Sequence, residues 1–222
     1  MKTRTAIIAT AMALSALLVP HTDASAANSA PAIDAFGTAF AKLNSFTFRM
    51  HSHEIKGTDV QDRIYAYAFL KPHFAKTLIE SGDSKGSGGV WAGGDQVSGH
   101  RGGILSGMHL KIDLHDWRAT SLRGYTIPQG LPQNIVAVYA TIKGDLKQSV
   151  GGKIDGTQTD LLDLKVADPA ANGGIEQQKL YLSQDTHFPL REILYAGNQV
   201  VLDQSFTDYN LNPNLTQNDF PF

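Results

Sequence analysis

Alternation with a period of two residues is the feature that most constrains this chain. Between residues 45 and 55, Phe46, Phe48 and Met50 alternate with polar side chains. Successive side chains of a strand point to opposite faces, so this segment predicts a strand with one buried face. Further predicted strands are 60–72, 73–82, two short ones within 89–100, 159–168, 176–184, 189–197 and 199–211. The connections are short and contain turn residues, which favours antiparallel pairing of neighbouring strands.

Two segments instead carry apolar side chains at the spacing of an amphipathic helix. The first is 30–43, and the second is 132–147, where Pro132 can occupy the first helical turn. Their apolar positions are Ile33, Phe36, Phe40 and Leu43, and Ile135, Val138, Ile142 and Leu146. The sequence therefore predicts an α+β fold, with one antiparallel sheet, one helix before it and one helix inserted midway.

The first 26 residues have the features of a cleaved secretory signal peptide. Lys2 and Arg4 precede an apolar run from 6 to 19, and Ala24-Ser25-Ala26 offers a small-residue cleavage site. The apolar run is shorter than the roughly 20 residues of a transmembrane helix. We therefore expect residues 27–222 to form a single domain in the periplasm, with no transmembrane segment after cleavage.

Composition excludes several classes of function. The 222 residues include no cysteine, so disulfides, thiolate catalysis and a lipid-bearing cysteine are all excluded. The formal net charge is −2, and no cluster of Lys and Arg is interleaved with aromatic residues. Nucleic acid is therefore not an expected partner.

Histidines give the clearest candidates for metal ligands. His51 and His53 share one face of a predicted strand, but no third ligand follows at a suitable spacing. If 108–115 is extended, His109, Asp113 and His115 also share a face, which leaves a small metallohydrolase as one alternative. The apolar residues between them equally fit a half-buried strand, so we expect no metal.

Sequence motifs of catalysis are missing. The glycine-rich run 85–94 does not end in the Gly-Lys-Ser/Thr of a phosphate-binding loop, and no Gly-x-Ser-x-Gly is present. No pair of carboxylates stands out for acid–base chemistry. We therefore predict no catalytic residue, no cofactor and no enzymatic activity.

Aromatic and large aliphatic side chains occur throughout the predicted helices and strands. A curved sheet covered by a helix can enclose an apolar cavity, although the same side chains could simply fill a core. The candidate ligand-binding residues are Phe36, Phe40, Phe46, Phe48, Tyr65, Tyr67, Phe69, Trp91, Leu180, Leu182, Tyr195 and Phe206.

Two stretches are similar to known families. In 179–222, Phe188-Pro-Leu-Arg191 follows a strand and Asp185, and Phe206-x-x-Tyr209 precedes Asn212-Pro-x-Leu215. This order resembles the closing strands of the LolA-like superfamily of periplasmic lipoprotein carriers. In 91–131, Gly99-His-x-Gly-Gly103 and Tyr125-x-Ile-Pro128 resemble an uncharacterised branch, domain-of-unknown-function family 1571.

The resemblance implies a fold and a function. The implied fold is a strongly curved antiparallel sheet, like an unclosed barrel, with helices on its concave side and apolar cargo between them. The implied function is a periplasmic carrier, with a lipid or acylated cargo and other envelope proteins as partners. The same fold also serves non-catalytic envelope scaffolds and sensors, which is a second alternative. Lipoprotein carriers need an early-strand arginine that holds the helical lid, and Arg49 and Arg63 are both candidates.

Overall fold

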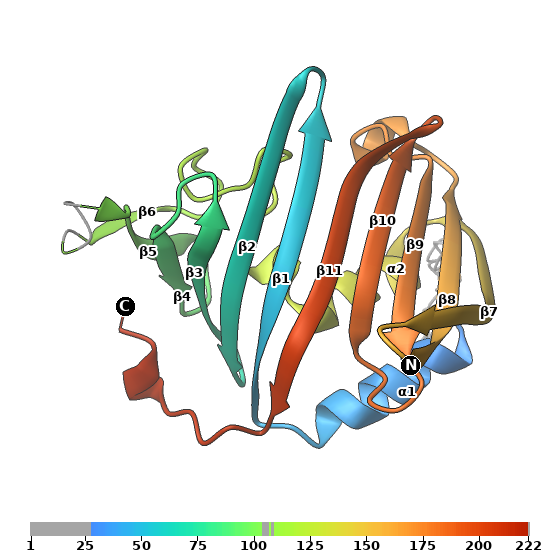
Figure 1. Cartoon of the computed structure of the whole chain (residues 1–222), viewed down its shortest axis with the longest axis horizontal. Coiled ribbons are helices and arrows are strands. Elements are labelled where there is room, and N and C mark those ends of the chain that lie inside the picture. Colours follow the sequence, from blue (N-terminus) through green and yellow to red (C-terminus); the bar gives the residue numbers. More distant parts are fainter. Residues whose placement is uncertain (1–27, 104–106, 108, 222) are drawn as a thin grey trace, which may run out of the picture.

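The computed structural model describes residues 28–103, 107 and 109–221. The predicted signal peptide, 1–26, lies outside the described residues. Within the described part, the chain forms an α+β fold in which one large, curved antiparallel sheet carries two α-helices on its concave side (Figure 1). The fold class predicted from the sequence is confirmed.

Eleven strands of the described chain form this sheet, in the order β6-β5-β4-β3-β2-β1-β11-β10-β9-β8-β7. The strands are β1 (Ser45–Lys56), β2 (Asp59–Leu70), β3 (Phe74–Gly82), β4 (Gly88–Trp91), β5 (Gln96–His100), β6 (Leu110–Asp113), β7 (Gly144–Ile154), β8 (Thr157–Val166), β9 (Gln177–Ser183), β10 (Pro189–Ala196) and β11 (Gln199–Leu211). Because β6 and β7 form the two edges and do not pair with each other, the sheet does not close into a barrel.

Two meanders make up the sheet. β1 to β6 pair in chain order, and so do β7 to β11. The meanders meet where β1 pairs with β11, a ladder that places Met50 opposite Phe206 and Ser52 opposite Gln204. Short turns connect most neighbours within each meander, as the sequence predicts, whereas the central ladder joins distant parts of the chain.

The first helix, α1 (Pro31–Ala41), agrees with its predicted stripe. Pro31 occupies its first turn, and Phe36 is buried against the sheet. At its C-terminus, the Lys71 ammonium donates to the carbonyls of Phe40 at 2.8 Å and Ala41 at 3.3 Å. A cation at this position satisfies free carbonyls and complements the helix dipole.

The second helix, α2 (Pro132–Thr141), ends six residues before the predicted boundary at 147. Residues 144–154 instead form β7, a strand that the helical spacing concealed. Ile142 already has an extended backbone, with ψ of 127°. A Cβ at Gly144 would lie 2.2 Å from the Lys165 carbonyl oxygen, so glycine allows the chain to approach β8 closely. The backbone ladder with β8 outweighs the helical pattern.

An aromatic core fills the α1 end of the concave side. Phe46 and Phe69 have ring centroids 5.0 Å apart, and Phe36 contacts Phe188 edge-on at 5.2 Å. Phe48 stacks on Tyr67 with centroids 4.9 Å apart. Such contacts add to the free energy gained by burying the rings.

Candidate functional site

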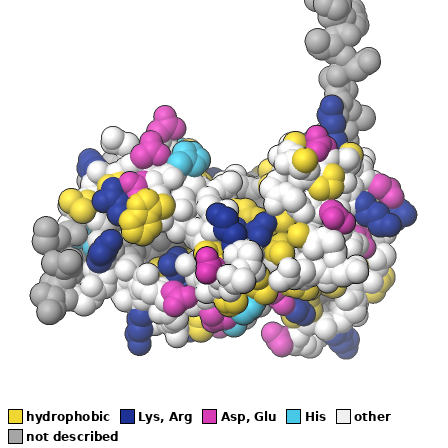
Figure 2. All heavy atoms as spheres, turned by 90° about the horizontal axis from the view of Figure 1, so that it is seen from above, with side chains coloured by type: hydrophobic (Ala, Val, Ile, Leu, Met, Phe, Trp, Pro, Cys, Tyr) yellow, Lys and Arg dark blue, Asp and Glu magenta, His cyan; other side chains and the backbone are white. Residues whose placement is uncertain are grey.

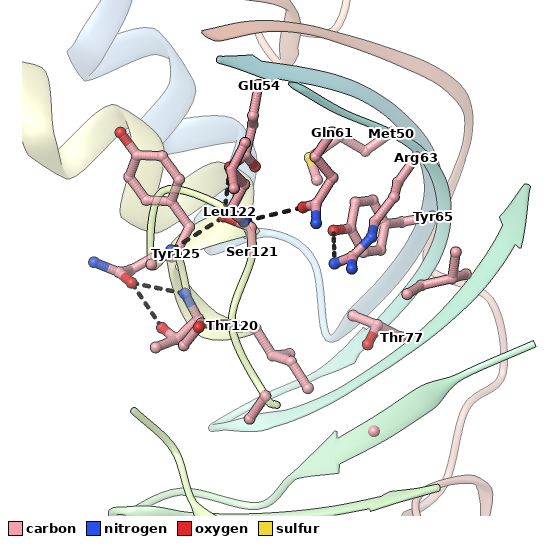
Figure 3. A pocket seen from close by; sticks show the side chains of 18 of the residues that line it. Met50, Glu54, Gln61, Arg63, Tyr65, Thr77, Thr120, Ser121, Leu122 and Tyr125 are labelled. Atoms are coloured by element: carbon pink, nitrogen blue, oxygen red, sulfur yellow. Dashed lines mark hydrogen bonds between the residues drawn. The ribbon is translucent and has the colours of Figure 1, made fainter. Parts of the chain in front are cut away.

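A cavity of about 1320 Å³ lies at the other end of the concave side (Figure 3). Its floor is the sheet, mainly β1 to β5 and β9 to β11. Its cover is formed by α2 and by the segment 117–130, which includes the 3₁₀ turn η2 (Pro128–Gly130). We call α2 and 117–130 together the cover.

Much of the wall is apolar. The apolar and aromatic lining residues include Met50, Tyr65, Tyr67, Ile79, Val97, Leu194 and Leu202 on the sheet side, and Trp117, Leu122, Ile127, Ile135, Val138, Ile142 and Ile175 on the opposite side. The cover packs closely in places, since a Cβ at Gly130 would lie 2.4 Å from the Tyr67 hydroxyl. Glycine at 130 therefore allows the cover to approach β2 closely.

The cavity reaches solvent near β6. Leu110 and Trp117 both line it, and they are 55% and 77% exposed. Seen from above, the molecule has a hollow between two lobes, where hydrophobic, basic and acidic side chains meet (Figure 2). These two side chains place exposed apolar surface at the opening of the cavity.

Glu54 of β1 ties the cover to the sheet. Its carboxylate accepts hydrogen bonds from the Ser121 hydroxyl at 2.7 Å and the Arg123 amide at 2.9 Å, as well as from the Ser52 hydroxyl at 3.3 Å. Beside it, the Gln61 side-chain oxygen accepts a bond from the Leu122 amide at 3.0 Å (Figure 3). Hydrogen bonds to a charged acceptor are stronger than neutral ones, so this carboxylate holds the segment firmly.

Arg63 of β2 also lines the cavity. It donates to the Tyr65 hydroxyl at 3.2 Å and to the Asp83 carbonyl at 2.9 Å (Figure 3). Burial raises the pKa of Tyr65, although the Arg63 guanidinium opposes the shift. Of the two arginines named from the resemblance, Arg49 instead lies on the convex face, where it pairs with Glu80 and Asp208.

Glu192 of β10 is a second buried carboxyl group on the cavity wall. It accepts a hydrogen bond from the Tyr139 hydroxyl of α2 at 3.3 Å. Burial raises the pKa of Glu192 to about 7, even though the Tyr139 bond favours the charged form. The same surroundings raise the pKa of Tyr125 to about 12, chiefly through burial and then through the nearby Glu192 charge. The Glu192 carboxyl group therefore titrates near neutral pH.

The predicted ligand-binding residues separate into three groups. Two of them, Tyr65 and Tyr67, line the cavity. Nine belong to the packed core or lie against it: Phe36, Phe40, Phe46, Phe48, Phe69, Trp91, Leu180, Leu182 and Phe206. The last, Tyr195, is half-buried and lies beneath the Lys179 ammonium. No α1 residue lines the cavity among those described, so the cover is α2 and 117–130. Ligand binding by these twelve residues stays a prediction.

The histidines do not gather into a metal site in the described part of the chain. No group of three or more His, Asp and Glu side chains there is arranged to hold an ion. His109 and His115 are exposed, and the Asp113 carboxylate accepts from the His115 backbone amide at 2.7 Å. On the convex face, His51 and His53 each lie 3.0 Å from a different oxygen of Asp62. His100 differs because it lines the cavity, as do Leu110 and Ile112 of β6.

Several polar residues of the cavity were missed from the sequence. Glu54, Gln178, Glu192 and Gln204 line it, and all four are buried. Each occupies a strand position in phase with buried apolar neighbours, as Glu54 does with Met50. A polar residue at an inward position was therefore the available signal.

Comparison with known proteins identifies the fold. The sequence matches no protein-family model and no curated protein. An uncharacterized conserved protein from Thermus thermophilus has a similar structure, with a TM-score of 0.56 and 11% identity, covering 85% of this chain and 90% of that one. The resemblance to family 1571 stays a prediction.

Two further structures align less closely. The Mycobacterium tuberculosis lipoprotein LppX gives a TM-score of 0.47 at 15% identity, covering 83% of this chain and 95% of that one. A putative outer membrane lipoprotein-sorting protein domain from Vibrio parahaemolyticus gives a TM-score of 0.44 at 12% identity. That alignment covers 85% of this chain and 95% of that one. Among the described residues, no helix is long and apolar enough to cross a membrane. The Thermus structure shows that the curved sheet with its helices is a fold found elsewhere.

Proposed function

We propose that this protein is a periplasmic binding protein that carries a lipid or acyl chain between its sheet and its cover. The observation that supports this most directly is the cavity of about 1320 Å³ with largely apolar walls. This volume exceeds the roughly 300–1,000 Å³ of most small-molecule sites, and it suits an extended apolar ligand. The predicted signal peptide supports the periplasmic location.

Burial of apolar surface would supply the binding energy. Each methylene group removed from water contributes about 0.8 kcal/mol, so a chain of about ten gains about 8 kcal/mol before the costs of association. The exposed Leu110 and Trp117 give a route of entry that avoids the packed aromatic core. Because apolar contacts have little directionality, chain length would be recognised only loosely.

Native mass spectrometry of protein isolated from its own periplasm tests the proposal. We expect an added mass that organic extraction removes and that lipid analysis identifies. The extracted protein should then bind a fluorescent fatty-acid analogue. Protein that carries nothing and binds no analogue would contradict the carrier function and favour a non-catalytic scaffold or sensor.

A matched pair of variants links binding to the cavity. Val138 lines it from α2, so Val138→Trp should fill part of the volume and weaken binding at least tenfold. Val150 on the edge strand β7 is 70% exposed, so Val150→Trp makes the same change outside the cavity and should bind as the parent does. Equal binding by both variants would place the ligand elsewhere.

A further inference from the structure

The cavity floor carries polar side chains in two adjacent rows across the sheet. In the first row, Arg63, Ser52, Gln204 and Glu192 are consecutive cross-strand partners on β2, β1, β11 and β10. In the second row, Gln61 pairs with Glu54, and Gln178 lies beyond Leu202 and Leu194. An apolar ligand alone would leave buried polar groups of these rows without partners, which is unfavourable.

The cover satisfies only part of these groups. Glu54 accepts bonds from three donors, and Gln204 donates to the Ser52 hydroxyl at 3.1 Å. Glu192 receives one bond, from Tyr139 at 3.3 Å. Gln178 is 4% exposed, and its side-chain amide has no hydrogen bond to another described residue, although it lines the cavity. The region around Glu192 and Gln178 therefore has unused hydrogen-bonding capacity.

The carboxyl groups of this region are Glu54 and Glu192. Two arginines lie nearby, and their hydrogen bonds go to neutral acceptors. Arg63 donates to Tyr65 and to the Asp83 carbonyl, and Arg123 donates to the Ile55 carbonyl at 2.9 Å.

Exposed cations of the cavity lining lie at its edges instead. They are Lys56 at the end of β1, and Lys85, Arg101 and Arg118 on the β3–β6 side. A charged Glu192 carboxylate would repel an anionic head group. Lys56, Lys85 and Arg101 would attract it at the edges. Arg118, by contrast, is already paired with Asp116 at 2.6 Å.

From this geometry we infer that the ligand carries a hydrogen-bond-donating group, an amine or a hydroxyl, that binds to Glu192 and Gln178 on the cavity floor. The inference rests on the proposed function and specifies the ligand class, a lipid amine or a lipid alcohol. An amine donates to both the Glu192 carboxyl oxygen and the Gln178 carbonyl oxygen. A hydroxyl donates its one proton to Glu192 and accepts from the Gln178 side-chain amide N–H. In both cases the apolar body contacts the cover. A free fatty acid, by contrast, would have to leave its carboxylate away from the floor.

Displacement of an uncharged fluorescent apolar dye tests the inference. The competitors are an amine, an alcohol and a carboxylate with the same long alkyl chain, measured above about pH 7, where Glu192 is charged. We expect the amine and the alcohol to bind at least tenfold more tightly than the carboxylate, the ratio given by one hydrogen bond to a charged group. An advantage of the amine over the alcohol would identify a charged ligand, and an advantage of the alcohol over the amine would identify a hydroxylated one. Equal binding of the two, both tighter than the carboxylate, would support the hydrogen-bond donor that they share.

Two variants assign the preference to named residues. Glu192→Gln should reduce the preference for amine over carboxylate about tenfold, and Gln178→Leu should weaken amine and alcohol binding alike. Gln178 has no side-chain partner to lose, so this variant should fold even if Glu192→Gln does not. Glu80→Gln, which makes the same chemical change on the convex face beside Arg49, should retain the parent's order of affinities.

The outcomes separate this inference from the proposed function. Binding of the dye with equal affinities for all three lipids, or with the carboxylate tightest, would overturn the inference and leave the carrier function standing. A preference that survives both cavity variants would also overturn it. Failure of every apolar compound to bind would refute the carrier function itself, and the inference with it.

Discussion

The two ends of the concave side are built on the same strands but packed differently. Towards α1, β1 directs Phe46 and Phe48 into a buried cluster of packed rings. A few residues further along the same strand, Glu54 lies on the floor of a cavity of about 1320 Å³, and Ser52 is buried beside it. The backbone ladder is continuous through both ends. Side-chain size and polarity, rather than the strands themselves, therefore decide where this fold is solid and where it is hollow.

Truncating the aromatic core should have the largest effect on stability. Phe46 is 1% exposed and contacts the rings of Phe40, Phe48, Phe69 and Phe188. Phe46→Ala should lower the free energy of unfolding by about 3–5 kcal/mol, because the packed surroundings cannot collapse into the space. Urea unfolding followed by circular dichroism measures this. A loss below about 1 kcal/mol would mean that the α1 end is also loosely packed.

Glu192 should make the stability of the cavity end depend on pH. Its pKa is raised to about 7 by burial, and Tyr139 and Tyr125 are the titratable groups that face it from the cover. Between about pH 4.5 and 7 the folded state holds a proton that the unfolded state releases, so rising pH destabilises the fold. The free energy of unfolding falls by about 3 kcal/mol in all, and the fall is complete above about pH 7.

Glu192→Gln should abolish this pH dependence. As pH rises from about 4.5 to 7, the variant should therefore become more stable relative to the parent. Denaturant unfolding of both proteins at several pH values measures the difference. Parallel stability curves would show that the carboxyl group is solvated in solution. Glu80→Gln on the convex face again provides the control.

Truncating the cavity wall should cost less than truncating the core. Val138 lines the cavity and is half-buried. Val138→Ala should lower the free energy of unfolding by about 1 kcal/mol or less, since its methyl groups already border empty space and little new cavity forms. The same urea experiment applies. A cost equal to that of Phe46→Ala would contradict the contrast between the two ends.

The exposed histidines should have the smallest effect. His109 and His115 are exposed, and the double change to Ala should alter stability by no more than about 0.5 kcal/mol. It should also leave dye binding unchanged. Stoichiometric zinc in the parent protein that disappears in the double variant would instead support the metallohydrolase alternative.

Local patterns predicted most of the sheet and the position of α1. Period-two alternation and turn residues suffice for strands such as β1 and β11, whose inner faces are apolar over much of their length. The pattern was wrong at β7, because Ile142 and Leu146 happen to keep a helical spacing across Gly144. Pairing with a neighbouring strand determines whether such a segment is a helix or a strand. That pairing cannot be read from the segment's own sequence.

The cavity was harder to predict for a different reason. The aromatic residues show where the sequence is rich in apolar side chains. At the α1 end these side chains pack against one another instead of lining the cavity. A hollow depends on which side chains meet across strands, such as Glu192 with Gln204, and on a cover supplied by 117–130. These pairings follow from the order of the strands in the sheet, which local spacing does not encode.

The central β1–β11 ladder has a consequence for folding kinetics. Each meander contains only local pairings, whereas this ladder closes a loop from Met50 to Phe206, and long loops form slowly. Met50 and Glu54 reach the cavity from one meander, and Gln204 and Glu192 from the other. The site therefore exists only after the slow closure, and a bound ligand would stabilise the closed state by mass action. Ligand uptake is then a measure of how much of the protein has completed its long-range assembly.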